Sequence, residues 1–212
     1  MDKYGYVQQL IDRYPALKCT EESIKSTCDM LEECYRAGGK FLIAGNGGSA
    51  ADSEHIVGEL MKGFVKPRSI PREFSDILKS IDEEKGDVLT GCLQQGIPAI
   101  ALSGHPALST AYLNDVEGTV GFAQQIYGYG KLEDVFLAIS TSGNSKNIIY
   151  AAITAKAMGI KVIGLTGGTG GLLKKYADIL INVPETETYK IQEYHLPVYH
   201  AICLELEERL FE

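Results

Sequence analysis

The chain is poor in basic residues: 20 Lys and Arg stand against 28 Asp and Glu in 212 residues, a formal charge of −8. This balance argues against nucleic acid as a partner, because nucleic-acid-binding domains carry a basic field, but it allows a local site for one small anion. No apolar run approaches the roughly 20 residues of a membrane span, and the polar start of the chain has no signal-peptide core. We therefore expect a cytoplasmic protein without a membrane partner.

Cysteine pairs are also missing. The five cysteines are scattered and form no C-x-x-C motif; they are Cys19, Cys28, Cys34, Cys92 and Cys203. This pattern predicts reduced thiols that pack as small apolar side chains, and neither a disulfide framework nor a cysteine-ligated zinc site.

Short apolar runs alternate with helical patterns along most of the chain. Runs that are apolar without alternation are typical of strands buried on both faces of a parallel sheet. The five runs are 41–44, 99–102, 135–139, 162–165 and 179–183, and the helical patterns between them cover about 49–62, 119–127, 145–158 and 171–176. The fold class predicted is therefore α/β, an open doubly wound sheet of five parallel strands flanked by helices.

Helical segments frame this sheet, and residues 1–212 are expected to form one domain. Residues 1–39 predict two helices, the first ending before Pro15 and the second capped by Thr20. A long helix is predicted over 189–210. Residues 64–96 are longer than a strand–helix–strand crossover requires and contain two weak helical patterns, 73–81 and 87–95, so we expect an inserted flap or helical hairpin there.

Glycine is abundant: 23 of the 212 residues are glycine, about 11% of the chain, against a usual share of about 7%. Many of them lie where predicted strands end, in the segments 45–49, 140–145 and 166–171. Glycine lets a backbone approach a ligand closely, and a helix that follows offers free N–H groups to an anion. The hydroxyl-rich segment 140–145 therefore predicts a phosphate site that needs no Lys or Arg.

Two nucleotide-binding alternatives fit poorly. The segment 45–50 nearly matches the dinucleotide fingerprint, but the acidic residue expected about 20 positions later is replaced by a proline-rich stretch. No G-x-x-x-x-G-K-[ST] motif is present, which excludes a P-loop.

Two groups of polar residues follow on predicted helices. His55 and Glu59 are four positions apart and share a helix face, either as an ordinary surface pair or as part of a site. The second group contains two of the chain's four histidines; it consists of Gln192, Glu193, His195 and His200. Packed core histidines are the alternative there.

Taken together, the motifs resemble those of a known family. The segments are GNGGSAADSEHIVGEL, LND, AISTSGNSKN, LTGGTGG and KIQEYHLPVYH. The chain resembles the sugar isomerase (SIS) superfamily and, within it, the phosphoheptose isomerases. The similarity extends over nearly the whole chain except 64–96. It implies the flavodoxin-like fold of a SIS domain.

The resemblance implies roles for individual residues. Zinc would be held by His55, Glu59, Gln192 and His200. Substrate contacts would come from Asn46, Gly47, Gly48, Glu59, Asn114, Asp115, Ser140, Thr141, Ser142, Ser145 and Gln192. We expect Glu59 to move a proton between two carbons through a cis-enediol, and His200 to assist ring opening and to move hydroxyl protons.

The function expected is aldose–ketose isomerisation of sedoheptulose 7-phosphate to D-glycero-D-manno-heptose 7-phosphate. Two alternatives remain: an isomerase of another sugar phosphate, and a SIS-fold protein that binds a replication initiator without catalysis. Gln192 and His200 are eight residues apart, about 12 Å along a straight helix. Both would reach one ion more easily if the site lay between subunits, and family members are similarly homotetramers with interfacial sites.

Overall fold

The five apolar runs form one parallel sheet in the computed structural model, which describes residues 3–211. The strand order is β2-β1-β3-β4-β5. The strands are β1 (Phe41–Ala44), β2 (Ala99–Ala101), β3 (Val135–Ile139), β4 (Lys161–Gly167) and β5 (Ile179–Val183). The predicted doubly wound α/β fold is therefore confirmed.

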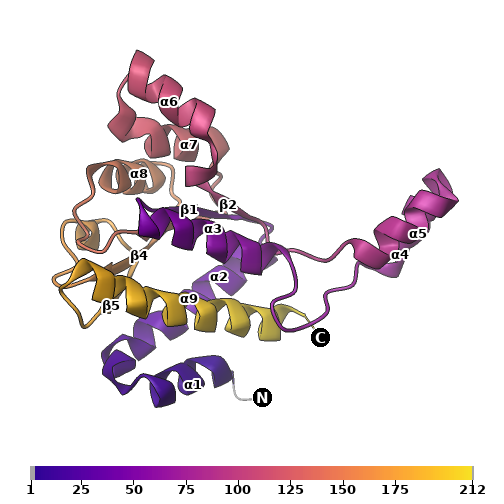
Figure 1. Cartoon of the computed structure of the whole chain (residues 1–212), viewed down its shortest axis with the longest axis horizontal. Helices are drawn as coiled ribbons and strands as arrows, with labels where there is room; N and C mark the ends of the chain where they lie inside the picture. Colours follow the sequence, from indigo (N-terminus) through magenta and orange to yellow (C-terminus); the bar gives the residue numbers. More distant parts are fainter. Residues whose placement is uncertain (1–2, 212) are drawn as a thin grey trace.

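Helices cover both faces of the sheet (Figure 1). The α-helices are α1 (Gly5–Arg13), α2 (Glu21–Arg36), α3 (Gly48–Met61), α4 (Arg72–Ile81), α5 (Glu83–Cys92), α6 (Pro106–Asp115), α7 (Gly121–Tyr129), α8 (Lys146–Ala157) and α9 (Thr188–Leu210). Short 3₁₀ turns lie at Pro15–Thr20, Leu102–Gly104, Gly118–Val120 and Leu173–Lys175.

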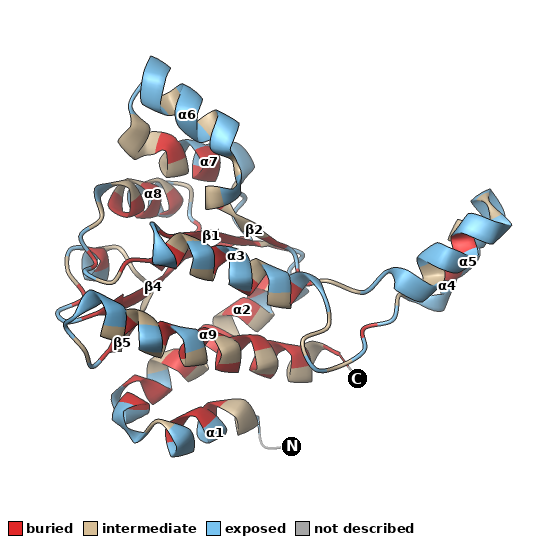
Figure 2. Ribbon diagram, in the orientation of Figure 1, coloured by how far each residue is buried: buried red, intermediate tan, exposed pale blue. Residues whose placement is uncertain are grey.

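Successive strand residues point to opposite faces and so divide the core in two. Phe41 and Ile43 of β1 belong to the cluster under α1, α2, α3 and α9, while Leu42 and Ala44 belong to the cluster under α7 and α8. Both clusters are buried along the sheet (Figure 2). This double burial is the physical reason why the strands are apolar at every position.

Helices α3 and α9 lie side by side and run in the same direction across one face of the sheet (Figure 1). Tyr199 of α9 contacts His55 of α3, and Glu207 accepts hydrogen bonds from Phe64 and Val65, which follow α3. This packing places the residues predicted on the two helices opposite one another.

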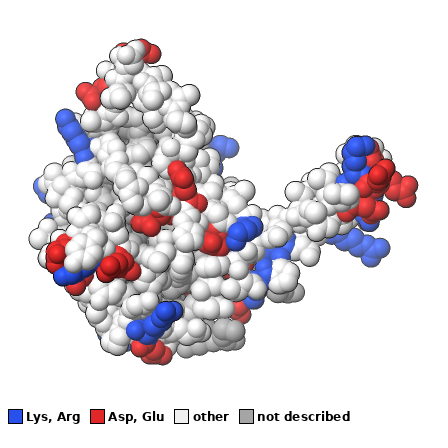
Figure 3. Space-filling model, in the orientation of Figure 1, with Lys and Arg blue, Asp and Glu red and all other residues white. Residues whose placement is uncertain are grey.

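Residues 72–92 form a helical hairpin, α4 and α5, that projects away from the rest of the chain (Figures 1 and 2). Asp82 caps α5 by accepting the Lys85 N–H at 3.0 Å, so this helix begins at Glu83, earlier than the pattern 87–95 predicted. Large apolar side chains remain exposed on the hairpin and at the residue that follows it: Phe74, Ile77, Ile81, Val88, Leu89 and Leu93. Acidic and basic side chains gather at its free end (Figure 3).

Three local expectations differ from the structure. Thr20 does not cap α2 with its side chain; its hydroxyl donates instead to the Leu17 carbonyl at 2.7 Å, within the 3₁₀ turn. The helical pattern at 171–176 forms only the short turn Leu173–Lys175. Helix α6 was not predicted, because none of its residues is buried and it shows no amphipathic pattern.

Candidate active site

The glycine loop after β1 and the hydroxyl-rich loop after β3 lie together, because β1 and β3 are neighbours in the sheet. Their side chains confirm the proximity. Asn46 donates to the amide oxygen of Asn147 at 3.0 Å, and Asn147 donates to that of Asn46 at 2.8 Å. This reciprocal pair ties the first loop to the start of α8. Asn147 was not among the predicted residues, although it lies only two positions after the predicted hydroxyl segment.

Within the hydroxyl-rich loop, the Ser140 hydroxyl donates to the Ser145 hydroxyl at 3.0 Å. Thr141 and Ser145 are half-buried and Ser142 is exposed, and α8 begins directly after them at Lys146. Hydroxyl groups at the N-terminus of a helix are a suitable environment for a phosphate group. The phosphate role of Ser140, Thr141, Ser142 and Ser145 stays a prediction that this geometry permits.

Glycines in these loops serve backbone packing as much as ligand approach. Gly143 has φ +64°, and a Cβ there would stand 2.1 Å from the carbonyl oxygen of Gly170. The loop at 167–171 therefore packs directly on the predicted phosphate loop. A Cβ on Gly48 would stand 2.5 Å from Nε2 of Gln192, which places Gln192 at the N-terminus of α3.

The second group of predicted residues lies further along α3 and α9. His55 Nε2 is 3.3 Å from Glu59 Oε1, and the rings of His55 and His200 are 5.0 Å apart between centroids. Lys62 Nζ stands 3.1 Å from the other oxygen of Glu59. The Glu59 side chain is 14% exposed, so this carboxylate is largely withdrawn from solvent. The three predicted residues His55, Glu59 and His200 are thus brought together.

Two further residues support His55. The Tyr199 hydroxyl lies 3.0 Å from His55 Nδ1 and 3.3 Å from Asp52 Oδ1. Burial, and then the neighbouring Asp52 carboxylate, raise the pKa of the Tyr199 phenol, which is therefore neutral near pH 7. The sequence offered one signal for Asp52, since it precedes His55 by three positions and so shares its helix face.

The two histidines of α9 have different surroundings. Burial, and then the nearby His55, lower the pKa of His200, whose Nε2 is buried without a hydrogen-bond partner. His195 is fully buried and its Nε2 lies 3.3 Å from the Thr166 carbonyl oxygen. Burial lowers the pKa of His195 to about 4. His195 is therefore a core histidine, and His200 belongs to the candidate site.

The donors at this site fit zinc in kind. Imidazole nitrogen and carboxylate oxygen are ligands that zinc accepts, and the unpartnered Nε2 of His200 is a free donor. Within residues 3–211, however, no three His, Cys, Asp or Glu side chains converge as a ready metal-binding group. Gln192 stands beside Gly48, eight residues before His200 on α9. One chain therefore presents part of the predicted ligand set.

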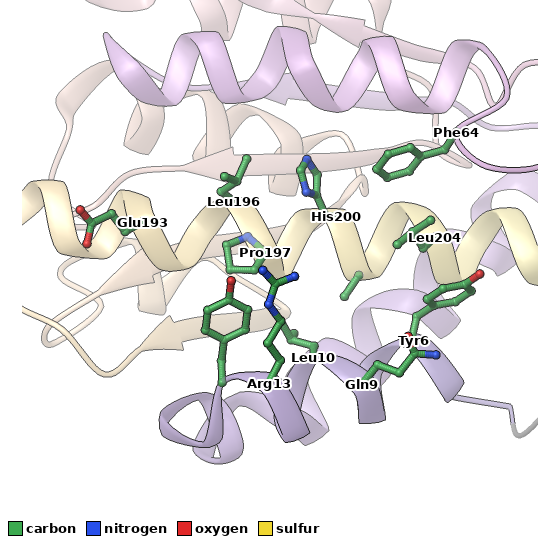
Figure 4. Close-up of a pocket in the computed structure, with 12 residues that line it drawn as sticks. Tyr6, Gln9, Leu10, Arg13, Phe64, Glu193, Leu196, Pro197, His200 and Leu204 are labelled. Atoms are coloured by element: carbon green, nitrogen blue, oxygen red, sulfur yellow. The ribbon is translucent and has the colours of Figure 1, made fainter.

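Other predicted residues lie elsewhere. Asn114 and Asp115 are exposed at the end of α6, on the far side of α7 and α8 from α9 (Figure 1), and the Asn114 amide donates to Asp115 at 2.7 Å. The structure of the single chain does not bring them to His55. A hollow of about 430 Å³ lies between α1 and α9 and is lined by His200, Phe64 and Arg13 (Figure 4). It opens the His200 side of α9 to solvent.

Comparisons with known proteins agree with this architecture. A SIS domain model matches residues 89–167. A phosphoheptose isomerase of Aneurinibacillus thermoaerophilus is 36% identical over 210 residues, 98% of this chain and 93% of that protein. Phosphoheptose isomerase 2 of Campylobacter jejuni is 39% identical over 188 residues, 89% of this chain and 81% of that protein.

Solved structures show the same similarity. A phosphoheptose isomerase from Francisella tularensis superposes with a TM-score of 0.76 and 29% identity, covering 96% of this chain and 95% of that one. The enzyme from Neisseria gonorrhoeae gives a TM-score of 0.74 and 30% identity, covering 95% and 94%. The fold and the loops at its carboxyl edge define a SIS-domain protein. Within that class, the chain belongs to the phosphoheptose isomerase family of aldose–ketose isomerases.

Proposed function

We propose that this chain converts sedoheptulose 7-phosphate to D-glycero-D-manno-heptose 7-phosphate. The observation that carries the proposal is the meeting of Glu59, His55 and His200 between α3 and α9, on a chain similar to phosphoheptose isomerases over nearly its whole length. A protein that only binds a partner has no need of this group. The non-catalytic alternative is accordingly not favoured.

Glu59 would act as the base. Isomerisation removes a proton from C1 of the ketose and returns a proton to C2, while a hydroxyl proton moves between the two oxygens. The Glu59 carboxylate is 14% exposed and lies within 3.3 Å of His55 and within 3.1 Å of Lys62, which restricts its orientation as a base requires. A positioned general base of this kind contributes about 10²- to 10⁴-fold to the rate.

His200 would open the sugar ring and transfer hydroxyl protons. Burial lowers the pKa of His200 and so favours the neutral ring, whose unpartnered Nε2 can accept a proton where it does not hold the metal. Zinc, held by His55, Glu59, Gln192 and His200, would polarise the sugar carbonyl as a Lewis acid. Asn46, Gly47, Gly48 and the hydroxyl-rich loop would position the phosphorylated sugar, with Asn114 and Asp115 as further sugar contacts.

The direct test follows solvent exchange at the sugar carbons. The protein is incubated in D₂O with sedoheptulose 7-phosphate, or with ribulose 5-phosphate, with zinc or with a chelator, and deuterium at C1 and C2 is measured by NMR. We expect exchange with the heptulose phosphate, a loss of at least about 100-fold in Glu59→Gln and His200→Ala, and dependence on zinc. Glu54→Gln, an exposed carboxylate on the same helix, is the control and should retain exchange. Failure of exchange with every sugar phosphate would contradict the proposal.

The proposed assembly is a homotetramer with active sites between subunits. Two observations support it: Gln192 and His200 are separated along α9, and the α4–α5 hairpin exposes apolar side chains such as Ile77, Ile81 and Val88. An active site shared by two chains predicts intersubunit complementation. We expect mixed oligomers of Glu59→Gln and Gln192→Ala to regain activity that neither variant has alone. Mixed oligomers that form and stay inactive would place all ligands in one chain.

The proposed location is the cytoplasm. No helix within residues 3–211 combines the length and apolar character needed to cross a bilayer. Cys28, Cys34 and Cys203 are buried as free thiols, and burial raises the pKa of Cys203 to about 12. Such unpaired, protonated thiols suit a reducing compartment.

A further inference from the structure

The Tyr199 hydroxyl lies between two groups, Asp52 and His55, with each of which it can form a hydrogen bond. It lies 3.3 Å from Asp52 Oδ1 and 3.0 Å from His55 Nδ1. Asp52 and His55 come from the face of α3 that packs on α9, and Tyr199 comes from α9. The Tyr199 ring is 2% exposed and stands edge-on to both His55 and His200, so its hydroxyl has little freedom to move away.

A phenol carries a single proton, which restricts the hydrogen bonds it can make. If Asp52 is a carboxylate, it can only accept, and the phenol proton must point to it. The phenol oxygen can then only accept from His55, so His55 must carry its proton on Nδ1. In the reverse arrangement the phenol donates to Nδ1 and the His55 proton lies on Nε2. Asp52, whose Oδ2 is already buried without a partner, would then have no donor for either oxygen unless it were protonated.

We propose that Asp52 and Tyr199 are positioning residues that fix the tautomer of His55. Asp52 accepts from the Tyr199 hydroxyl, Tyr199 accepts from Nδ1–H of His55, and the lone pair of His55 Nε2 is left free for a metal ion. The competing tautomer would donate Nε2–H to Glu59 Oε1, 3.3 Å away, and the Asp52–Tyr199 pair opposes it. Histidines that bind metals usually donate their second nitrogen to a carboxylate, a carbonyl or water, and this contact holds the ring in its binding tautomer. Here the tyrosine is interposed between the carboxylate and the histidine.

The proposal rests on the proposed function in one respect only, namely that His55 Nε2 binds the metal of the isomerase. The position of the proton itself is a property of the metal-free, substrate-free protein. It is measured with ¹⁵N-labelled histidine by long-range proton–nitrogen NMR, at a pH where His55 is neutral. The His55 signals are assigned by their loss in His55→Gln.

We expect the wild-type spectrum to show the proton on Nδ1 of His55. In Tyr199→Phe, which keeps the ring and removes the hydroxyl, the Nε2–H tautomer should gain population. Zinc affinity, measured by competition with a coloured chelator, should fall about 10- to 100-fold. Asp52→Asn retains an acceptor oxygen and should give a smaller loss than Asp52→Ala.

Tyr194→Phe is the matched control, because Tyr194 lies on the same helix and packs against Tyr14. It should leave both the tautomer and the zinc affinity unchanged. A wild-type spectrum with the proton on Nε2 would overturn the proposal without recourse to any variant. So would a folded Tyr199→Phe protein that binds zinc as tightly as wild type. Absence of isomerase activity with the Nδ1–H tautomer present would instead count against the proposed function alone.

Discussion

Glu207 is expected to be among the most costly single residues to replace outside the active site. Its carboxylate is fully buried near the end of α9. One oxygen accepts from the Phe64 N–H at 2.7 Å and from Nε of Arg68 at 2.8 Å, and the other accepts from the N–H groups of Val65 and Lys66 at 2.8 and 3.1 Å. The residue therefore holds the chain that leaves α3.

The substitution Glu207→Gln preserves the volume and removes the charge. The new amide NH₂ group faces donors, so two backbone N–H groups lose their acceptor, at about 1–3 kcal/mol for each buried group. Arg68, 2% exposed, also loses its counter-charge, and breaking a buried pair costs about 3–5 kcal/mol. These costs overlap because the amide can rotate and water can reach Lys66, so we expect a loss of about 3 kcal/mol.

The assay is denaturant unfolding at fixed protein concentration together with the melting temperature. A loss of about 3 kcal/mol corresponds to a decrease of about 6–12 °C for a chain of this size. Glu208→Gln is the matched control: Glu208 pairs with Lys66, both side chains are half-buried, and its removal should cost at most about 1 kcal/mol. Arg68→Met combined with Glu207→Gln should cost less than the sum of the two single changes. Equal stability losses in the Glu207 and Glu208 variants would refute the reasoning.

Three further outcomes follow from the structure. The pKa of His195 falls from 6.5 to about 4 on folding, so the unfolded chain binds more protons than the folded chain between these pH values. The free energy of unfolding of the wild type should therefore drop by about 3 kcal/mol as the pH falls from 6.5 to 4. His195→Gln should lose this pH dependence, as measured by urea unfolding. Gly143→Ala should raise KM more than it lowers kcat, because the added Cβ would clash with the Gly170 carbonyl oxygen. Gly91→Ala, where the added Cβ has open space on α5, should leave KM unchanged. Similar KM values for the two variants would show that the contact between the two loops does not affect substrate binding. Ile81, on the hairpin, is 78% exposed, and Ile81→Glu should weaken oligomers in sedimentation experiments. An unchanged sedimentation coefficient would show that the hairpin is not part of the subunit interface.

The sheet could be predicted because its strands are apolar at every position. All five runs appear as strands within about two residues of the expected bounds, since burial on both faces leaves little room for polar residues. The hairpin was also expected as two helices. The direction in which the hairpin projects was not predicted. It depends on the contact of Arg68 with Glu207 of α9, and the residues of the segment 64–96 alone do not reveal that contact. Helix α6 escaped prediction because a helix without a buried side has no hydrophobic period.

The candidate site was predictable where a single helix fixes it. His55 and Glu59 share a face by their spacing alone, and the structure places them 3.3 Å apart. Tyr199 could not be assigned in this way, because its contact with His55 depends on the register in which α9 packs against α3. The same holds for Gly143, whose neighbour Gly170 comes from another strand end. Such contacts arise only from tertiary packing.

The alignment of α3 with α9 also sets the length of the site. Gly48 stands opposite Gln192, and seven residues later His55 stands opposite Tyr199, so these two contacts between α3 and α9 are about 10 Å apart along the helices. The predicted phosphate loop joins the first end through the Asn46–Asn147 pair, while Glu59 lies at the second. If the predicted phosphate loop and Glu59 of one chain act on the same substrate, several carbons must separate its phosphate from the reacting carbons. A seven-carbon sugar phosphate has such a separation, and a three-carbon one does not.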